Sequence, residues 1–403
     1  MNKPGAIFVI GSLLASLATP VFARTANDPF FSEQWYLNQI SAPSAWDAAT
    51  GSDAVVVAVL DSGVDPDHPD LADNLWVNPG EIPDNGKDDD GNGYVDDTRG
   101  WDFVSDDNTP EPDAGTDNFV VDGVAHGTVI AGIIGAVGNN GEGVSGVVWS
   151  VRVMPVRILD DNGSGDSQDA TSAIRYAIDN GADVINLSFT GYDIDSRLET
   201  AINEAYVAGV PVVAAAGNYR DTGLNLNEVP VYPACFVGTK ADWVIGVAST
   251  DENDAKADFS NYGSDCVEIA APGVDIFNAM YQNEHWDEFD RAYAGGWGGT
   301  SVSAPIVTGA IALLKSAYPT LGPSLIRTIL QLSADPIRDA NVEPGALGTG
   351  RLNVARALEI AAEVRIGLDE GAGDAMARGA GLAADAAAMQ AERHVEAIGE
   401  ADL

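Results

Sequence analysis

Short apolar runs alternate along the chain with longer segments in which apolar residues recur at helical spacing. A run such as AVVVAVL (54–60) has no polar position, as expected for a strand that is buried on both faces of a parallel sheet. Segments 167–182 and 196–210 place their apolar residues along one stripe, which is typical of an amphipathic helix. The alternation predicts an α/β fold with a mainly parallel sheet and helices on both faces. The expected strands are residues 54–60, 151–159, 183–189, 210–216 and 243–249.

Two segments do not follow this alternation. Residues 76–123 form a long acidic stretch with Gly and Pro and no clear periodicity, and residues 361–403 are rich in Ala, Gly and Glu without a large apolar face. We expect the first segment to be an insertion, and the second to be a marginal helix or disordered. A single domain is then predicted over residues 24–360.

Residues 1–23 have the pattern of a secretory signal. Lys3 precedes an apolar run, and the run ends in the small-x-small pattern VFA (21–23). The run is short and is interrupted by a Gly-Ser pair, which favours a cleaved signal over an uncleaved membrane anchor. We therefore expect cleavage after Ala23, a secreted or periplasmic protein, and no attachment to a membrane after cleavage.

The chain is strongly acidic. It has 20 Lys and Arg residues against 61 Asp and Glu residues, a formal net charge of −41. Nucleic acids and anionic lipid surfaces are bound through basic patches, so this balance argues against both as partners.

The chain has two cysteines, Cys235 and Cys266. In an oxidising compartment they are expected to form a disulfide, and two buried thiols are the alternative. Two cysteines are too few to define a disulfide scaffold, and they lack the partners for a zinc site.

Three residues with reactive side chains stand where predicted elements begin or end. Asp61 ends the first apolar strand, and functional groups collect at such strand ends in parallel α/β sheets. His126 precedes a helical stretch of small and apolar residues, and Ser301 opens the apolar helical stretch 298–315. Taken singly, each has an ordinary structural explanation, because Asp61 and Ser301 could cap helices and His126 could be a buried histidine with satisfied hydrogen bonds.

The motifs around these residues together resemble those of the subtilisin-like serine proteases, with the thermitase-like branch closest. They are DSG (61–63), HGT (126–128), AAAGN (214–218) and GTSVSAP (299–305). The order Asp, His, Ser along the chain is that of the subtilisins, and the similarity runs from about residue 28 to residue 358. The resemblance implies a three-layer subtilisin-like α/β fold and an enzyme that hydrolyses peptide bonds in polypeptides.

The resemblance also implies a role for each residue. Ser301 would attack the peptide carbonyl, and His126 would take its proton and later protonate the leaving amine. Asp61 would orient the imidazole, and Asn218 would donate a hydrogen bond from its side-chain amide to the oxyanion. The reaction would pass through an acyl-enzyme on Ser301 and would need no metal.

In the family, two chain segments flank the pocket for the substrate residue that precedes the scissile bond. Here they correspond to Leu187, Ser188, Phe189, Thr190 and Gly191 and to Ala215, Ala216 and Gly217. The substrate would bind beside them as an extended strand. Thr190 departs from the family pattern, in which glycine is common, and its Cβ is expected to narrow the pocket.

The stretch DDDGNGYVDD (88–97) has the residue types of a calcium loop. Asp88, Asp90, Asn92, the Tyr94 carbonyl and Asp96 match ligand positions of an EF-hand loop, although no glutamate stands at the last position. We expect an EF-like calcium loop without flanking helices, and a solvated acidic loop is the alternative.

The resemblance implies two further structural calcium sites. One corresponds to Asp102, Asp107, Thr109 and Glu111 and the other to Asp28, Asp70 and Asn140. The second would clamp the N-terminal arm to the body of the domain, so calcium would act as a scaffold and not in catalysis.

The sequence thus favours a secreted, calcium-stabilised and monomeric serine endopeptidase. A narrow-specificity processing protease is an alternative, favoured by Thr190 and the long insertion. A calcium-binding interaction protein on an inactive protease fold is another, against which the four intact catalytic positions count. Family members commonly carry an inhibitory pro-domain after the signal, but only residues 24–30 lie in that interval here, so we expect none there.

Overall fold

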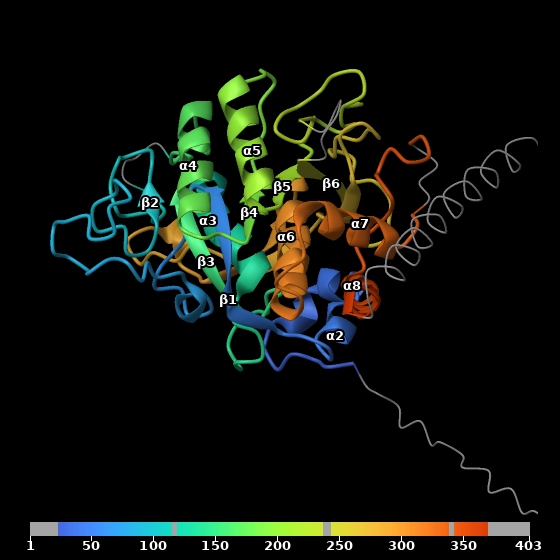
Figure 1. The fold of residues 1–403 in the computed structure, drawn as a ribbon, viewed down its shortest axis with the longest axis horizontal. Helices are drawn as coiled ribbons and strands as arrows, with labels where there is room; N and C mark the ends of the chain where they lie inside the picture. The colour runs from blue at the N-terminus through green and yellow to red at the C-terminus, as the bar shows by residue number, and fades with distance from the viewer. Residues whose placement is uncertain (1–22, 115–118, 237–242, 338–341, 370–403) are drawn as a thin grey trace, which may run out of the picture.

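A seven-stranded sheet forms the centre of the protein. The computed structural model describes residues 23–114, 119–236, 243–337 and 342–369. Within these residues the strand order is β2-β3-β1-β4-β5-β6-β7, and every neighbouring pair is parallel (Figure 1). The strands are β1 (Gly51–Asp61), β2 (Trp101–Asp102), β3 (Ser150–Arg157), β4 (Val184–Leu187), β5 (Val212–Ala215), β6 (Val244–Thr250) and β7 (Ile269–Pro272).

The burial of β1 explains its continuous apolar run, AVVVAVL (54–60). Val57 and Val59 belong to the hydrophobic core on one face of the sheet, and Ala58 and Leu60 belong to the core on the other face. Successive side chains of a strand point to opposite faces, so a strand covered on both sides has no position for a polar residue.

Helices cover both faces of the sheet. α4 (Ser167–Asp179) and α5 (Ser196–Ala208) lie side by side on one face, where Figure 1 shows them in green. The other face packs against α3 (Val121–Gly135) and α6 (Thr300–Ala317). This arrangement confirms the predicted three-layer α/β fold with a parallel sheet.

Smaller elements complete the fold. α8 packs against both α7 and α2, which brings the C-terminal part of the described chain against its N-terminal part. β8 and β9 form a separate antiparallel pair that precedes α6. These elements and the remaining short helices are η1 (Phe31–Glu33), α1 (Trp35–Gln39), α2 (Ala42–Ala45), η2 (Ala72–Asn74), β8 (Ile276–Ala279), η3 (Asp287–Phe289), β9 (Tyr293–Trp297), α7 (Pro323–Ser333) and α8 (Val354–Asp369).

Element boundaries differ from the sequence-based expectation in two places. α3 begins at Val121, inside the segment 76–123 that was expected to lack periodicity, so His126 lies within the helix and not before it. α8 continues to Asp369, past the predicted domain end at residue 360. The predicted signal, up to residue 22, and residues 370–403 of the predicted tail lie outside the described residues.

The structure joins Cys235 and Cys266 in a disulfide, with an S–S distance of 2.11 Å and a Cα–Cα distance of 4.6 Å. The bond ties the loop before residue 237 to the segment that leads into β7.

Among the described helices, α6 is the one that has the length and hydropathy to cross a bilayer. It packs inside the domain instead, since 83 % of this helix is buried and it contacts β1, β4, β5, β6 and β7.

Candidate active site

Asp61, His126 and Ser301 come from three elements that meet at one corner of the fold. Asp61 is the last residue of β1, His126 lies in the first half of α3, and Ser301 is the second residue of α6. β1, α3 and α6 contact one another pairwise. The carboxyl end of a parallel strand thus delivers Asp61 to the place where the two helices pass.

A short hydrogen bond links Asp61 to His126. Nδ1 of His126 lies 2.7 Å from Oδ1 of Asp61. The backbone N–H of Ser62 donates to the same carboxylate oxygen at 2.8 Å, and Asp61 is fully buried. An ionised carboxylate only accepts hydrogen bonds, so it holds the proton of His126 on Nδ1 and leaves Nε2 as the basic nitrogen.

The chain after Asp61 fixes the position of α3. Ser62 Oγ donates to the carbonyl of Val124 at 3.3 Å and accepts from the N–H of Gly127 at 3.1 Å. A Cβ on Gly127 would lie 2.2 Å from the carbonyl oxygen of Gly63, so only glycine permits this approach of helix and turn. The glycine of the HGT motif therefore serves the close packing that places the imidazole.

The surroundings raise the pKa of His126 above its ordinary value. Burial by itself lowers this pKa, but the charge of Asp61, its hydrogen bond and the charge of Asp122 together outweigh burial. These charges therefore favour the protonated imidazole.

Ser301 is held at the start of α6 by two backbone features. Pro305 has no N–H to donate to the Ser301 carbonyl four residues earlier, and Ser188 Oγ donates to that carbonyl instead, at 2.8 Å. Gly299, with φ of 146°, precedes the helix, and a Cβ there would lie 3.0 Å from Ser301 Oγ. His126 and Ser301 share no hydrogen bond in this structure, and catalytic bonds of this kind tighten when substrate binds.

Asn218 follows β5 and lies next to Ser301. Its Oδ1 accepts hydrogen bonds from the N–H of Thr300 at 2.9 Å and from the Thr300 hydroxyl at 3.2 Å. This network assigns the amide orientation. Nδ2 and Ser301 Oγ then lie near the same point, since a Cβ on Gly299 would be 3.2 Å from Nδ2 and 3.0 Å from Oγ. Asn218 is exposed, so a substrate oxygen can reach the amide.

Thr300 and Asn261 support the site, and the sequence analysis did not single them out. Thr300 Oγ1 accepts from the N–H of Gly217 at 2.8 Å, so it links α6 to the segment that carries Asn218. Asn261 Nδ2 donates to the carbonyl of Ala216 at 2.9 Å. Thr300 lies inside the GTSVSAP motif, which is a signal, but no local pattern marks Asn261.

The eight predicted substrate-binding residues lie on two neighbouring segments. Leu187 ends β4, Ala215 ends β5, and these strands are paired. Thr190 is exposed and faces Gly217, because a Cβ on Gly217 would lie 3.3 Å from Thr190 Cγ2. The remaining members are Ser188, Phe189, Gly191 and Ala216, of which Gly191 is exposed and Phe189 is half-buried.

Asp28, Asp70 and Asn140 come together, as the resemblance implied. Asp28 is 4 % exposed and accepts from the N–H groups of Asn139 at 2.8 Å and Asn140 at 3.0 Å. Asp70 accepts from Asn140 Nδ2 at 2.9 Å and from the N–H of Val144 at 2.7 Å. Burial, which outweighs the hydrogen bonds and is aided by the charge of Asp70, raises the pKa of Asp28.

The acidic loop groups its carboxylates differently from the EF-like expectation. Carboxylate oxygens of Glu81, Asp90 and Asp97 lie within 4.8 Å of one another, and of these only Asp90 was predicted as a ligand. Asp88 instead accepts the N–H groups of Gly91, Asn92 and Gly93, and Asp96 accepts those of Asn85 and Gly86. Asn92 and Tyr94 remain in the loop, with Tyr94 donating its N–H to Asn92 Oδ1 at 2.8 Å.

The four residues of the expected calcium site, Asp102, Asp107, Thr109 and Glu111, have protein partners in the structure. Asp102 Oδ2 accepts from Arg157 Nη1 at 2.6 Å, and both residues are buried. Its other oxygen accepts two backbone N–H groups of the following turn, and the Asp107 carboxylate accepts from Thr109. Asp102 is thus paired with an arginine in this structure, and calcium at these four residues stays a prediction.

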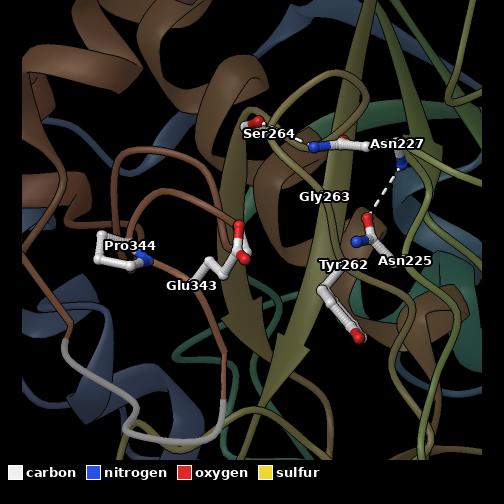
Figure 2. A pocket seen from close by; sticks show the side chains of 8 residues that line it. Asn225, Asn227, Tyr262, Gly263, Ser264, Glu343 and Pro344 are labelled. Atoms are coloured by element: carbon white, nitrogen blue, oxygen red, sulfur yellow. Dashed lines mark hydrogen bonds between the residues drawn. The ribbon is translucent and has the colours of Figure 1, made fainter.

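A small polar pocket lies elsewhere in the domain. Figure 2 shows it between Asn225, Tyr262, Ser264 and Glu343, with a volume of about 30 Å³. Asn227 Nδ2 donates to Ser264 Oγ at its rim. The pocket has room for one or two water molecules, and no catalytic or substrate-binding candidate lines it.

The chain matches a known family and several known proteins. The model of the subtilase family matches residues 52–358. Thermitase from Thermoactinomyces vulgaris is 37 % identical over 336 residues, which are 83 % of this chain and 99 % of thermitase. Halolysin from Haloferax mediterranei is 34 % identical over 85 % of this chain and 56 % of halolysin.

A solved structure described as proteases from Pseudoalteromonas arctica PAMC 21717 has the same fold. It matches with a TM-score of 0.66 and 32 % identity, over 84 % of this chain and 99 % of that chain. The fold and the matched relatives define the class: this chain belongs to the subtilase family. It is, more particularly, a subtilase-family serine endopeptidase.

Proposed function

We propose that the protein hydrolyses polypeptides through an acyl-enzyme on Ser301, with His126 as the base and Asp61 as its partner. The observation that carries this proposal is the 2.7 Å bond between buried Asp61 and His126 Nδ1, at the corner where α6 presents Ser301. Nε2 takes the Ser301 proton as Oγ attacks the carbonyl, and it returns that proton to the leaving amine. Water then hydrolyses the ester by the same route.

Asn218 would stabilise the charge that develops on the carbonyl oxygen. Its Nδ2 and the backbone N–H of Ser301 are the proposed donors, and the positive end of the α6 dipole adds to their effect. Thr300 holds the amide in place before the substrate arrives, so the donors need not reorganise during the reaction.

A pre-steady-state burst tests the acyl-enzyme. With a p-nitrophenyl ester of a short peptide, we expect a burst of about one p-nitrophenol per enzyme molecule, followed by slower turnover. Ser301→Ala should show no burst. Its turnover should fall to the small residual rate that substrate binding and the oxyanion donors can sustain without a nucleophile. A Ser301→Ala variant with an unchanged burst would overturn the assignment.

We further propose that Thr190 restricts the substrate residue before the scissile bond to small side chains. Thr190 stands opposite Gly217, where a Cβ on Gly217 would lie 3.3 Å from Thr190 Cγ2. The two segments therefore approach each other where the side chain of the substrate residue would enter the pocket. This observation favours the second candidate, a protease of narrow specificity, within the same chemistry.

A graded series of variants tests this restriction. Thr190→Ser removes only the methyl group, Thr190→Ala removes the hydroxyl as well, and Thr190→Gly opens the pocket fully. We expect the ratio of kcat/KM for a Phe substrate over an Ala substrate to rise about tenfold across the series. A ratio that stays constant would show that Thr190 does not limit the pocket.

Calcium at Asp28, Asp70 and Asn140 is proposed to hold the N-terminal arm. These carboxylates share hydrogen bonds with the loop 139–144, and oxygen ligands of this kind suit calcium. The ion would supply stability and no catalytic step.

Export and a monomeric state are part of the proposal. The signal pattern of residues 1–23 supports export, and one relative, 33 % identical and from Xanthomonas campestris, is named extracellular protease. Mass spectrometry of the protein from culture medium should find an N-terminus after Ala23, and an intact N-terminus in the membrane fraction would contradict this.

A further inference from the structure

Three carboxylates of the acidic loop, which we define as residues 76–100, converge on one point. Oxygens of Glu81, Asp90 and Asp97 lie within 4.8 Å of one another. Glu81 is 8 % exposed and Asp97 is fully buried, while Asp90 is exposed. Two buried negative charges beside a third repel each other strongly unless a positive charge lies among them.

The donors that the described residues supply to this point are neutral. Asn78 Nδ2 donates to Asp90 and Asp97, at 2.9 Å each, and Asn92 Nδ2 donates to the same two carboxylates at 3.3 and 3.0 Å. The Tyr176 hydroxyl donates to Asp97 at 2.6 Å. Among residues 23–114, 119–236, 243–337 and 342–369, no Lys, Arg or His forms an ion pair with any of the three carboxylates.

Glu81 provides a second and independent observation. Its Oε1 accepts from the N–H groups of Asp89 at 2.9 Å and Asp90 at 3.2 Å. Its Oε2 is buried and has no hydrogen-bond partner in the part of the chain that the structure describes. A buried carboxylate oxygen without a donor is unfavourable in a folded protein. Asp61 Oδ2 is also buried without a donor, but His126 can balance the charge of Asp61, whereas Glu81 forms no ion pair with Lys, Arg or His among the described residues. A cation is therefore the partner that the charge of Glu81 lacks.

We propose that Glu81, Asp90 and Asp97 bind a calcium ion. The ligand set consists of carboxylate oxygens alone, which selects a hard cation and argues against zinc, because zinc prefers His and Cys. An irregular loop adapts to the variable geometry of calcium more readily than to the strict octahedron of magnesium. Asp90 is the one member that this set shares with the EF-like set, because Glu81 and Asp97 lie outside the EF-like spacing.

The ion would fasten the acidic loop to the body of the domain. Asp97 is bonded to Tyr176 of α4, and Tyr94 packs its ring against Tyr176 and Trp101 with centroids 4.9 Å apart in each case. Figure 1 shows this loop beside β2, at the edge of the sheet. β3 separates β2 from the strand that carries Asp61, so the ion would stabilise the edge of the fold without touching the catalytic residues.

Calcium titration calorimetry on the full chain tests the site. All proteins in this test carry Ser301→Ala. The substitution prevents self-cleavage if Ser301 is the nucleophile, and calcium binding is then measured independently of the proposed function. We expect Glu81→Gln to bind one calcium fewer, or to bind it at least tenfold more weakly. Asp84→Asn, an exposed carboxylate of the same loop, is the matched control and should bind calcium as the parent does.

Asp88→Asn distinguishes the two possible ligand sets. If Asp88→Asn loses the ion and Glu81→Gln keeps it, the EF-like set is correct and the proposal is overturned. Unchanged stoichiometry and affinity in Glu81→Gln would also overturn it.

Thermal unfolding distinguishes the loss of a calcium ligand from a general loss of stability in the variant. With calcium, the Tm of Glu81→Gln should fall below that of the parent by roughly 5–10 °C. With chelator, its Tm should equal or exceed that of the parent, because the substitution removes a buried charge that repels its neighbours. A Tm that is lowered equally in both conditions would show a structural role without calcium and would contradict the proposal.

Discussion

The catalytic corner and the acidic loop both gather polar side chains, but they balance their charges in different ways. At the corner, Asp61 shares Oδ1 with His126 and a backbone N–H while its buried Oδ2 has no partner among the described residues, and Asn218 has Thr300. In the loop, three carboxylates share neutral donors, and the buried Glu81 Oε2 has no partner among the described residues. His126 can balance the charge of Asp61 within the protein, whereas we infer that a cation balances the carboxylates of the loop.

This difference predicts a separation of effects. Substitutions at the corner should change the rate and leave the Tm nearly unchanged, because the reactive groups add little to packing. Substitutions among the calcium ligands should change the Tm and leave the turnover of the folded enzyme unchanged.

Replacement of the nucleophile should have the largest effect. Ser301→Ala is expected to lower kcat by about 10⁶-fold, which is the loss found in subtilisin, a member of the same family. Its Tm should stay within a few degrees of the parent, because a small, half-buried hydroxyl is lost. Steady-state kinetics and calorimetry on the same preparation check both values, and a large fall in Tm would remove the basis for assigning the lost rate to chemistry.

Loss of the oxyanion donor should have the next largest effect. Asn218→Ala is expected to lower kcat by about 10²–10³-fold with a small change in KM. Thr300→Val, which keeps the shape but removes the hydroxyl that orients the amide, should lower kcat by roughly tenfold.

Thr308→Val is the matched control for Thr300→Val. Thr308 lies in the same helix, is also buried, and donates to Asn186 at 2.9 Å. It should lower the Tm and leave kcat unchanged. Equal losses of kcat in the two variants would mean that the helix as a whole, and not the Thr300 hydroxyl, sets the rate.

Loss of calcium at the N-terminal arm should act on stability alone. Asp28→Asn is expected to lower the Tm in calcium by roughly 5–10 °C, since an ion that binds only the folded state stabilises it by mass action. In chelator the difference between variant and parent should disappear. A lower kcat of the variant, measured at a temperature at which both proteins are fully folded, would contradict a purely structural role.

The pH dependence of the rate should respond to the charge of Asp122. Protonated His126 cannot act as a base, so a raised pKa moves the acidic limb of kcat/KM to higher pH. Asp122→Asn removes a negative charge that favours the imidazolium, so the limb should move to lower pH. Asp53→Asn, at the opposite end of the strand that carries Asp61, should leave the limb in place. A limb that moves to higher pH in Asp122→Asn would reverse the inferred sign.

Regular elements and catalytic candidates could be predicted because each leaves a local pattern. The strands buried on both faces are continuous apolar runs, and the helices over 167–179 and 196–208 follow a clear stripe. The start of α3 was missed, because Val120 makes no side-chain cap and Gly123 lies in the first turn. β2, with two residues, is too short to show a period, and β7 ends in a proline, which argues against a strand within a sheet.

The parts of the site that depend on tertiary contacts could not be predicted. Arg157 neutralises Asp102 from a neighbouring strand, and no sequence spacing reveals that pair. Glu81 and Asp97 fall outside the EF-like spacing, since the loop folds back on itself to bring them to Asp90. The acidic composition indicated a cation, but the choice of ligands required the fold.

One measurement tests most directly the claim that the corner is complete without the cation. Purified protein would be titrated with a serine-directed fluorophosphonate, once in calcium and once in chelator, at a temperature at which both samples are folded. The account predicts about one label per molecule on Ser301 in both samples, at similar rates. Labelling that fails in chelator while the protein remains folded would contradict the separation of the two regions, and labelling elsewhere than Ser301 would contradict the catalytic assignment.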